Sequence, residues 1–432
     1  MKRILRRLLL RLLKNTILMK NLLMNFIKLS ISTLLIFSNL IFAHGRVGGF
    51  VDHEPTVINF PDTSEYQIFT VDLHTHSVFS DGHVWPTVRV GEAEHEGIDL
   101  IAVTEHLEYQ PHKMDIPHPD RNRSYEIAKK SIETDLLVVN GAEITRLFPP
   151  GHINAVFIKD ANKLLNIDRS KQSELDDLLK NASQNFIDEY SGNPWFNDAG
   201  LAALWPVEEA LVEARRQGAF VFWNHPVWSA ETDNVETIVG DLNKYLFEQN
   251  LVHGIEVVNG QWFSDEAFQI ALDYNLTMLG TSDIHGLTEW DYLNEPGGHR
   301  PLTLVLAKNR TETDIKEALL AGRTVIWYKN DLIGLEENLL PILEKSLEIM
   351  DVTYKGRTIG NVELKNHTDV RFMLRVADDS LIENSSNIII VEPNESTVFE
   401  LKYARGNPIS LNVEVLNAYI KPKIHPIINL SY

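Results

Sequence analysis

Short apolar runs alternate with amphipathic stretches from residue 70 to about residue 328. The apolar runs predict β-strands at residues 68–73, 100–103, 136–139, 153–158, 220–223, 255–258, 277–279, 302–306 and 324–327. Segments with helical spacing lie between several of these runs, at residues 87–96, 124–133, 207–217, 265–274 and 311–321. Gly97, Gly218 and Gly322 each follow one of these segments, in the place where a glycine ends a helix. The alternation predicts an α/β fold, either a parallel barrel or a doubly wound sheet.

The pattern changes after a last predicted helix at residues 335–350. Beyond it, alternating β-type runs at residues 362–364, 370–374, 388–391, 398–401 and 411–416 are separated by turn residues. They predict a small β-sandwich-like domain, so residues 335–432 would form a linker helix and a β domain after a barrel at residues 44–334. This β domain holds only two histidines, and we expect a packing or carbohydrate-facing role for it rather than a second metal site.

One stretch of the barrel region, residues 161–205, is long and polar with a helical middle. It predicts an insertion that folds over one end of the sheet, with a plain surface excursion as the alternative.

The first 43 residues are basic and then apolar, with eight Lys or Arg, no Asp or Glu, and a long apolar run that ends at Ala43. This pattern is typical of a secretory signal peptide cleaved after Ala43, and it predicts export to the periplasm or the extracellular space. A start at Met19 or Met24 would give the peptide a more usual length. The alternative is an uncleaved membrane anchor, but the apolar run is short for a membrane span. We therefore expect no stable membrane insertion after cleavage.

The 432 residues include no cysteine, which excludes disulfides, thiolate metal sites and cysteine nucleophiles. Any metal must then be held by His, Asp and Glu, a ligand set that favours Zn, Mn or Fe. The formal charge is −20, and removal of residues 1–43 leaves 32 basic residues against 60 acidic ones, or −28. Since so acidic a surface repels polyanions, we expect no nucleic-acid partner.

Side chains suited to metal binding recur where the apolar runs end. The run at 68–73 leads into His74 and His76, which share one face of an extended chain, and Asp81 follows in a turn before Gly82. Other runs are followed or preceded by residues of the same kind, namely His106, Glu143, His152, His225, Asp283 and His285. Because α/β folds place their sites at the carboxyl ends of strands, the pattern predicts a metal centre there.

In this order, these residues resemble the PHP family, the metal-dependent phosphoesterases named for polymerase and histidinol phosphatase. The resemblance covers roughly residues 70–306 and implies a distorted seven-stranded (β/α) barrel with three divalent metal ions. By this resemblance, the chain has a suitable residue at all nine ligand positions of the three-metal form: His74, His76, Asp81, His106, Glu143, His152, His225, Asp283 and His285. The family usually has Asp where this chain has Glu105; we expect this change to affect fine geometry rather than metal binding, because the residue would steer an imidazole.

The resemblance also implies how the ligands are shared. One ion would bind His74, His76, Glu143 and Asp283. Glu143 would bridge to a second ion, completed by His152 and His225, and the third ion would be held by Asp81, His106 and His285. The expected reaction is in-line attack of a metal-bound hydroxide on phosphorus, with Glu143, Asp283 and His285 at the catalytic centre.

A loop rich in His and Arg follows His106. It supplies four candidates for binding the substrate phosphate or protonating a leaving group: His112, His118, Arg121 and Arg123. A solvated loop is the alternative. Several loop tryptophans, Trp262 among them, are candidates for the pocket wall, although packing is the more common role of such residues.

The function indicated by the sequence is hydrolysis of phosphate esters of small organic molecules. Diesters are favoured over monoesters, because some secreted PHP phosphodiesterases look similar in carrying a small β domain after the barrel. The alternatives are a phosphomonoesterase like histidinol phosphatase, and a module that binds metal or phosphate without catalysis; the complete ligand set argues against the latter.

Overall fold

The computed structural model of the chain describes residues 19–20, 56–146, 148–165, 206–226, 239–292, 298–377, 381, 387–402 and 408–432. The predicted signal peptide, apart from residues 19–20, and the predicted insertion from residue 166 onward lie outside these ranges. The chain divides into two compact units, Met1–Glu54 and Pro55–Tyr432, and the description below concerns the second. Among the helices in the described ranges, none has the length and apolarity needed to cross a membrane.

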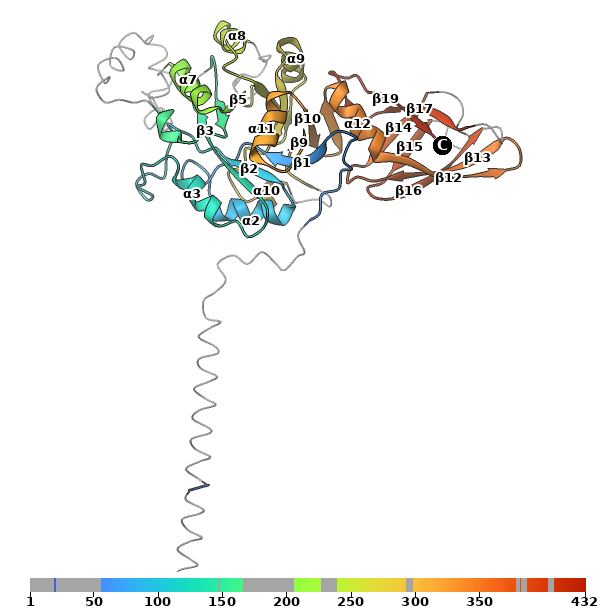
Figure 1. The fold of residues 1–432 in the computed structure, drawn as a ribbon, viewed down its shortest axis with the longest axis horizontal. Helices are drawn as coiled ribbons and strands as arrows, with labels where there is room; N and C mark the ends of the chain where they lie inside the picture. Colours follow the sequence, from blue (N-terminus) through green and yellow to red (C-terminus); the bar gives the residue numbers. More distant parts are fainter. Residues whose placement is uncertain are drawn as a thin grey trace, which may run out of the picture. The chain divides into compact units, whose positions relative to one another are not determined.

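The barrel region is built on one large curled sheet (Figure 1). Its strands are β1 (Gln67–Asp72), β2 (Leu100–Val103), β3 (Leu137–Ile144), β4 (Ile153–Val156), β5 (Phe220–Trp223), β6 (Gly254–Asn259), β7 (Trp262–Phe263), β8 (Thr277–Thr281), β9 (Leu302–Ala307), β10 (Thr324–Tyr328) and β11 (Asp331–Gly334). They pair in the order β11-β10-β9-β1-β2-β3-β4-β5-β6-β7, with β8 paired to β6. The α/β class and the barrel predicted from the sequence are confirmed.

The sheet is mixed, whereas the alternation of elements predicted a parallel one. β4 runs antiparallel to both β3 and β5, and β9 runs antiparallel to β1. The physical reason lies in the connections. Only eight residues join β3 to β4, and a parallel crossover needs a dozen or more.

β8 closes the curl through side chains as well as through its ladder with β6. The hydroxyl of Thr303 on β9 accepts from the backbone N–H of Gly280 at 3.0 Å and donates to its carbonyl at 2.9 Å. A Cβ at Gly280 would lie 2.4 Å from Cγ2 of Ile326 on β10, so only glycine permits this approach. The close contact fixes the strand that leads directly into Asp283.

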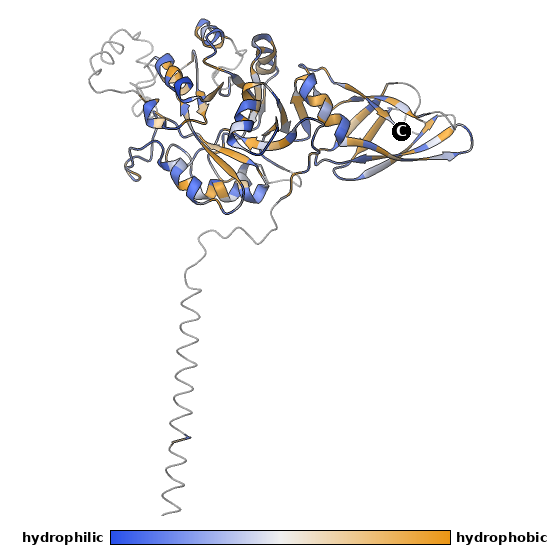
Figure 2. Ribbon diagram, viewed as in Figure 1, coloured by the Kyte–Doolittle hydropathy of each residue, from blue (hydrophilic) through white to orange (hydrophobic). Residues whose placement is uncertain are grey.

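Helices surround the sheet with their apolar faces turned inward, as the two-coloured ribbons in Figure 2 illustrate. They are α2 (Pro86–Glu96), α3 (Arg123–Lys130), η1 (Ala161–Lys163), α7 (Val207–Gln217), α8 (Asp241–Glu248), α9 (Asp265–Tyr274), α10 (Thr288–Asp291), α11 (Glu312–Leu320) and α12 (Glu336–Ser346). Gly97 and Gly218 end α2 and α7 in the left-handed conformation, as predicted. The side chains of Ser264 and Thr311 cap the amino ends of α9 and α11.

The C-terminal region forms the predicted β-sandwich. One sheet consists of β12 (Leu347–Lys355), β13 (Ile359–Asn366) and β16 (Ser396–Lys402). The other consists of β14 (Phe372–Val376), β15 (Ile388–Val391), β17 (Ser410–Val415) and β19 (Ile427–Ser431). A further strand, β18 (Ala418–Tyr419), leaves the sandwich and pairs in parallel with β11 of the barrel sheet.

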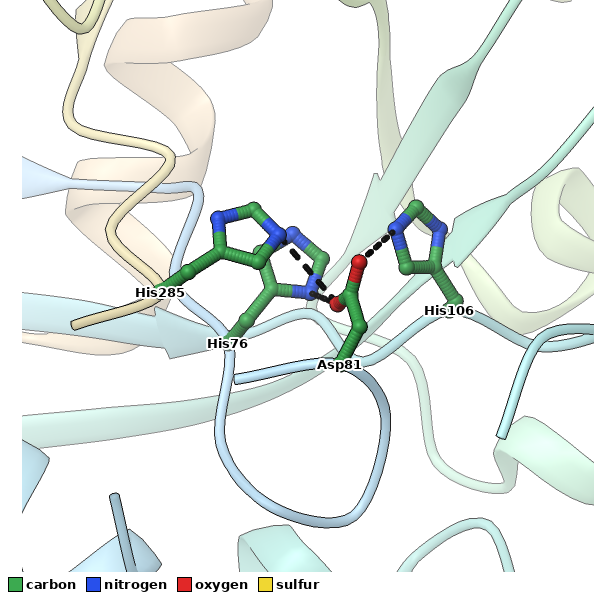
Figure 3. A group of neighbouring side chains, drawn as sticks. All are labelled: His76, Asp81, His106 and His285. Carbon is green, nitrogen blue, oxygen red and sulfur yellow. Dashed lines mark ion pairs between the residues drawn. The ribbon is translucent and has the colours of Figure 1, made fainter. Parts of the chain in front are cut away.

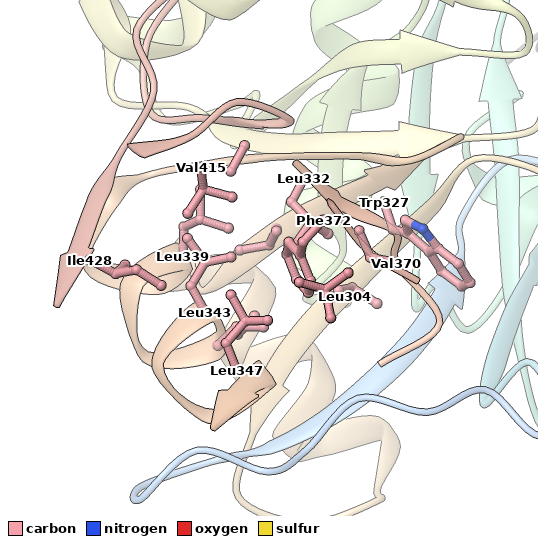
Figure 4. Packing of buried hydrophobic residues seen from close by; sticks show 14 of the residues in the cluster. Leu304, Trp327, Leu332, Leu339, Leu343, Leu347, Val370, Phe372, Val415 and Ile428 are labelled. Atoms are coloured by element: carbon pink, nitrogen blue, oxygen red, sulfur yellow. The ribbon is translucent and has the colours of Figure 1, made fainter. Parts of the chain in front are cut away.

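The barrel and the sandwich share one hydrophobic core (Figure 4). Leu304 and Leu332 of the barrel strands, Leu339 of α12 and Phe372 of the sandwich are all buried in the same cluster. Helix α12 therefore links the barrel to the sandwich in sequence and also packs in the core that the two domains share.

Candidate metal centre

The nine predicted ligands meet at one edge of the barrel sheet. His74 and His76 follow β1, Glu143 lies near the end of β3, and other candidates follow β2, β5 and β8. His152 precedes β4, but because β4 is antiparallel its beginning lies at the same edge. Isolated backbone bridges join Thr75 to Ile284 and His106 to Glu143, and they hold these loops in register beyond the strands.

The loop after His76 turns back so that Asp81 faces the other ligands. The backbone N–H of Gly82 donates to the carbonyl of Ser77 at 3.0 Å. A Cβ at Gly82 would lie 2.7 Å from the backbone nitrogen of Ser77, closer than any side chain tolerates. The Asp-Gly turn predicted from the sequence thus directs the carboxylate of Asp81 toward the other candidate ligands.

Four donor atoms form the innermost group: Nε2 of His74, Nε2 of His76, Oε2 of Glu143 and Oδ1 of Asp283. The two nitrogens are 3.0 Å apart, and each lies 3.1–3.4 Å from both oxygens. Ligands about 2.0–2.2 Å from a tetrahedral ion stand about 3.3–3.6 Å from one another. The spacing of this group therefore fits a transition-metal ion.

A second group surrounds Asp81 (Figure 3). Its Oδ1 lies 3.2 Å from Nε2 of His285 and 3.7 Å from Nδ1 of His76, and its Oδ2 lies 3.4 Å from Nε2 of His106. His76 thus stands between this group and the innermost one, whereas the resemblance assigned it to a single ion. These four residues could hold a metal ion.

The third group lies on the opposite oxygen of Glu143. Its Oε1 is 2.9 Å from Nδ1 of His152 and 3.4 Å from Nε2 of His225, and it accepts a hydrogen bond from the Asn224 amide at 2.8 Å. Glu143 therefore presents one oxygen to each of two groups, which is the arrangement a bridging carboxylate needs.

Burial and opposite charge shift the pKa values of the cluster strongly. Burial lowers the pKa of His74, but Asp283, Glu256 and Glu143 outweigh it and hold that pKa well above its ordinary value. Burial raises the pKa of Glu143, but the imidazoles of His106, His74 and His152 hold it well below its usual range. Opposite charges within the cluster thus favour ionised carboxylates.

Unpaired oxygens are a further feature of the cluster. Oδ1 of Asp81 and Oε2 of Glu143 are buried and find no hydrogen-bond donor of acceptable geometry among the described residues. A buried carboxylate oxygen without a donor is costly, and a coordinated cation would satisfy both. The donor set and these oxygens fit a cluster of divalent metal ions.

Two of the predicted ligands have unusual backbone conformations. The φ angle is 22° at His225 and 50° at Asp283, in the region that disfavours side chains. Such conformations persist where the surrounding structure imposes them, and they gather at functional sites. Here they turn both side chains into the cluster.

A residue that the sequence analysis missed, Glu256 on β6, is fully buried behind the cluster. Its Oε1 lies 2.7 Å from Nδ1 of His74, and its Oε2 accepts from the backbone N–H of His225 at 2.6 Å. It also accepts from Thr281 and Asn259. The sequence contained an indication of this role, because Glu256 is the one charged residue within a run that is otherwise apolar from 255 to 258.

Glu105, the departure from the family pattern, does steer an imidazole, though through an intermediate. Its carboxylate accepts from the hydroxyls of Ser77, Ser80 and Ser124. Ser80 in turn lies 3.1 Å from Nδ1 of His76.

The predicted substrate-binding loop lies to one side of the cluster. His118 is exposed, and Arg123 opens helix α3, where it pairs with Glu126 at 3.2 Å. Arg121 borders a small separate cavity behind His106, and its Nε and Nη1 find no hydrogen-bond partner among the described residues. His112 is half-buried. Their role in binding substrate stays a prediction.

The cluster forms the floor of a cavity of about 600 Å³. Asp81, Glu143, Asp283 and His285 are among its floor residues, and the β6–β7 hairpin and α10 provide one wall. Of the four predicted substrate-binding residues, none is among the described residues that line this cavity.

Comparison with known proteins matches both parts of the chain. The model of an Ig-like domain matches residues 347–431. The crystal structure of a two-domain protein from Bacteroides vulgatus, containing a predicted PHP-like metal-dependent phosphoesterase, is 34% identical, with a TM-score of 0.74 over 88% of this chain and 100% of that one. A proposed metal-dependent phosphoesterase from Bifidobacterium adolescentis is 19% identical, with a TM-score of 0.35 over 60% of this chain and 98% of that one. Among curated proteins no match was found.

Fold and site together define a metal-dependent phosphoesterase with an α/β barrel and an Ig-like C-terminal domain. The chain belongs to the PHP-like metal-dependent phosphoesterases, in their two-domain form.

Proposed function

We propose that the chain hydrolyses phosphate esters of small organic molecules and prefers phosphodiesters to phosphomonoesters. The observation that carries the proposal is the convergence of nine side chains suited to metal binding, from loops far apart in sequence, on one cluster, seven of which line a single cavity. The name of the Bacteroides relative supports the same chemistry.

Three divalent ions, Zn, Mn or Fe, would be held by the three groups of donors, with Glu143 shared between two of them. Bound ions of this kind lower the pKa of water and stabilise the charge that develops on phosphoryl oxygens. The chain's own residues fix the donors before substrate arrives, since Glu256 holds His74 and Ser80 holds His76. The side chains of Asp283 and His285 are 19% and 34% exposed, so they border the space where substrate would lie.

The preference for diesters follows from charge. The described residues that line the cavity include no Lys or Arg, and they do include the acidic Asp291. A monoester carries close to two negative charges at neutral pH, and a diester carries one. A wall without cations disfavours the second charge, so the more weakly charged ester fits better.

The test compares bis(p-nitrophenyl) phosphate with p-nitrophenyl phosphate, using the metal-loaded protein and its chelator-treated form. We expect faster turnover of the diester, loss of turnover on chelation, and up to three bound ions by elemental analysis. Glu143→Ala should lose turnover together with bound metal, whereas Glu248→Ala, at an exposed glutamate on α8, should change neither. Bound metal with neither ester cleaved would point to a binding module instead, and faster monoester turnover would reverse the preference.

We also propose that residues 1–43 are removed on export. The basic and then apolar pattern of that segment supports this. Amino-terminal sequencing of the protein recovered from the periplasm or medium should begin at His44; a protein retained in the membrane with its amino terminus intact would contradict it.

A further inference from the structure

One wall of the cavity is the β-hairpin formed by β6 and β7. β6 and β7 pair antiparallel, with Asn259 opposite Trp262 and Val258 opposite Phe263. Directly opposed residues share a face of the hairpin. Asn259 and Trp262 line the cavity, whereas Val258 is fully buried in the core on the other face.

This wall is fixed by hydrogen bonds before any ligand is present. The hydroxyl of Tyr328 donates to the carbonyl of Gln261 at 2.7 Å, and the Gln261 amide donates to the carbonyl of Asp291 at 2.8 Å. The hydroxyl of Tyr292 donates to the carbonyl of Ser282 at 2.9 Å, next to Asp283. The hairpin, the end of α10 and the ligand loop are thus tied into one rigid unit.

Trp262 is 72% exposed although it lines this cavity. A large aromatic side chain held on a rigid hairpin and left open to a pocket offers a flat apolar surface to a ligand. Asn259 is occupied, because its amide donates to Glu256 and lies near Asp283. Asp291, an exposed residue at the end of α10, lines the same cavity, and its carboxylate can accept hydrogen bonds.

The chemistry of the wall selects among organic groups. An aromatic face suits a ring with an apolar face, and a carboxylate suits a group with hydroxyl donors. The absence of Lys and Arg among the described lining residues disfavours an organic group with further phosphates, which cationic side chains would normally bind. A sugar ring combines an apolar C–H face with a rim of hydroxyls and carries no charge.

We propose that this wall is the subsite for the organic part of the substrate and that it binds a sugar ring. The ring would stack on Trp262, with its hydroxyls donating to Asp291. The substrate class is then a sugar phosphate ester, and this inference rests on the proposed phosphoesterase function.

The first test measures binding, without turnover. In calorimetric titrations of the metal-loaded full-length protein, glucose 1-phosphate should bind at least tenfold more tightly than inorganic phosphate. Trp262→Ala should abolish this advantage while leaving phosphate binding within twofold. Phe263→Ala, on the opposite face of the same strand, should preserve it. Equal affinity of the wild-type protein for both ligands, or an advantage that survives Trp262→Ala, would overturn the proposal.

The second test measures turnover of three p-nitrophenyl diesters, whose second group is methyl, glucose 6-yl or thymidine 5′-yl. We expect the lowest KM for the glucose ester, and a rise of about tenfold in that KM in Trp262→Ala with kcat nearly unchanged. A thymidine ester preferred to the glucose ester would assign the wall to a nucleobase and overturn the inference. If no diester is cleaved but the binding advantage persists, the subsite stands and the proposed reaction fails.

Discussion

Oε1 of Glu256 lies 2.7 Å from Nδ1 of His74, and both side chains are fully buried. This contact fixes the imidazole so that Nε2 faces the other donors, as carboxylates behind metal-binding histidines do. Replacement by Gln keeps the shape but removes the charge. We expect Glu256→Gln to weaken metal binding by about tenfold to a hundredfold. Competition with a chelator measures this affinity, and the exposed Glu248→Gln is the matched control; equal affinities in the two variants would contradict the role.

A buried ion pair lies beneath the cluster. Nη1 of Arg300 is 3.1 Å from Oδ2 of Asp72, whose side chain also accepts from the N–H and hydroxyl of Ser282. Arg300 also pairs with Glu96 at 2.7 Å, so its loss leaves two carboxylates without their cation. We expect Arg300→Met to lower the free energy of unfolding by about 3–5 kcal/mol. Chemical denaturation measures it, and the double variant with Asp72→Asn should recover part of the loss if the unpaired charge is its cause.

The acidity of one half-buried carboxyl makes stability depend on pH. Burial raises the pKa of Asp331 to about 6, and Lys329 and His425 offset only part of that effect. The folded protein therefore holds this proton more tightly than the unfolded chain, whose Asp pKa is about 3.9. Stability from this group is present below pH 4 and is lost as the pH rises through 6.

Asp331→Asn removes this loss, because asparagine cannot ionise. We expect a higher Tm than that of the wild type at pH 8 and an unchanged Tm near pH 4. Thermal melts at the two values test the sign, and a lower Tm of the variant at pH 8 would show that the charged form is stabilised instead.

The shared core predicts that barrel and sandwich unfold together. Phe372 is fully buried in the cluster that also contains Leu332 and Leu339. Phe372→Ala should lower the free energy of unfolding by about 3–5 kcal/mol and shift a single transition, because the barrel loses the same packing. Val398→Ala, at a side chain 64% exposed, is the control. Two separate transitions in calorimetry would show that the domains are independent.

Local signals placed several elements well. Residues 100–103 and 220–223 are β2 and β5, and residues 207–217 and 265–274 are α7 and α9, at the predicted bounds. Those helices begin and end at caps such as Ser264 and Gly218, which act within a few residues. The convergence of the nine candidate ligands was also predicted, because each lies close to the end of an apolar run that is visible in the sequence.

Other features depend on contacts that a single chain segment does not encode. The predicted helix at 335–350 ends at Ser346, and β12 begins at Leu347. Leu347 and Ile349 pack in the core of the sandwich. The sequence did not reveal this boundary, because the four residues 347–350 fit the spacing of a helix as well as that of a strand. The two-residue strands β7 and β18 are defined by their partners. The small cavity at Arg121 and the pairing of Arg123 with Glu126 could likewise not be predicted, because both depend on the conformation of the loop that follows His106.

Strand β18 has a consequence beyond joining two domains. β11 would otherwise end the barrel sheet with open backbone N–H and C=O groups, and such an edge invites pairing with a second molecule. Two residues of the Ig-like domain, Ala418 and Tyr419, pair with this edge strand. Replacement of that domain would therefore expose the edge strand β11, so the Ig-like domain also protects the chain against self-association through this edge.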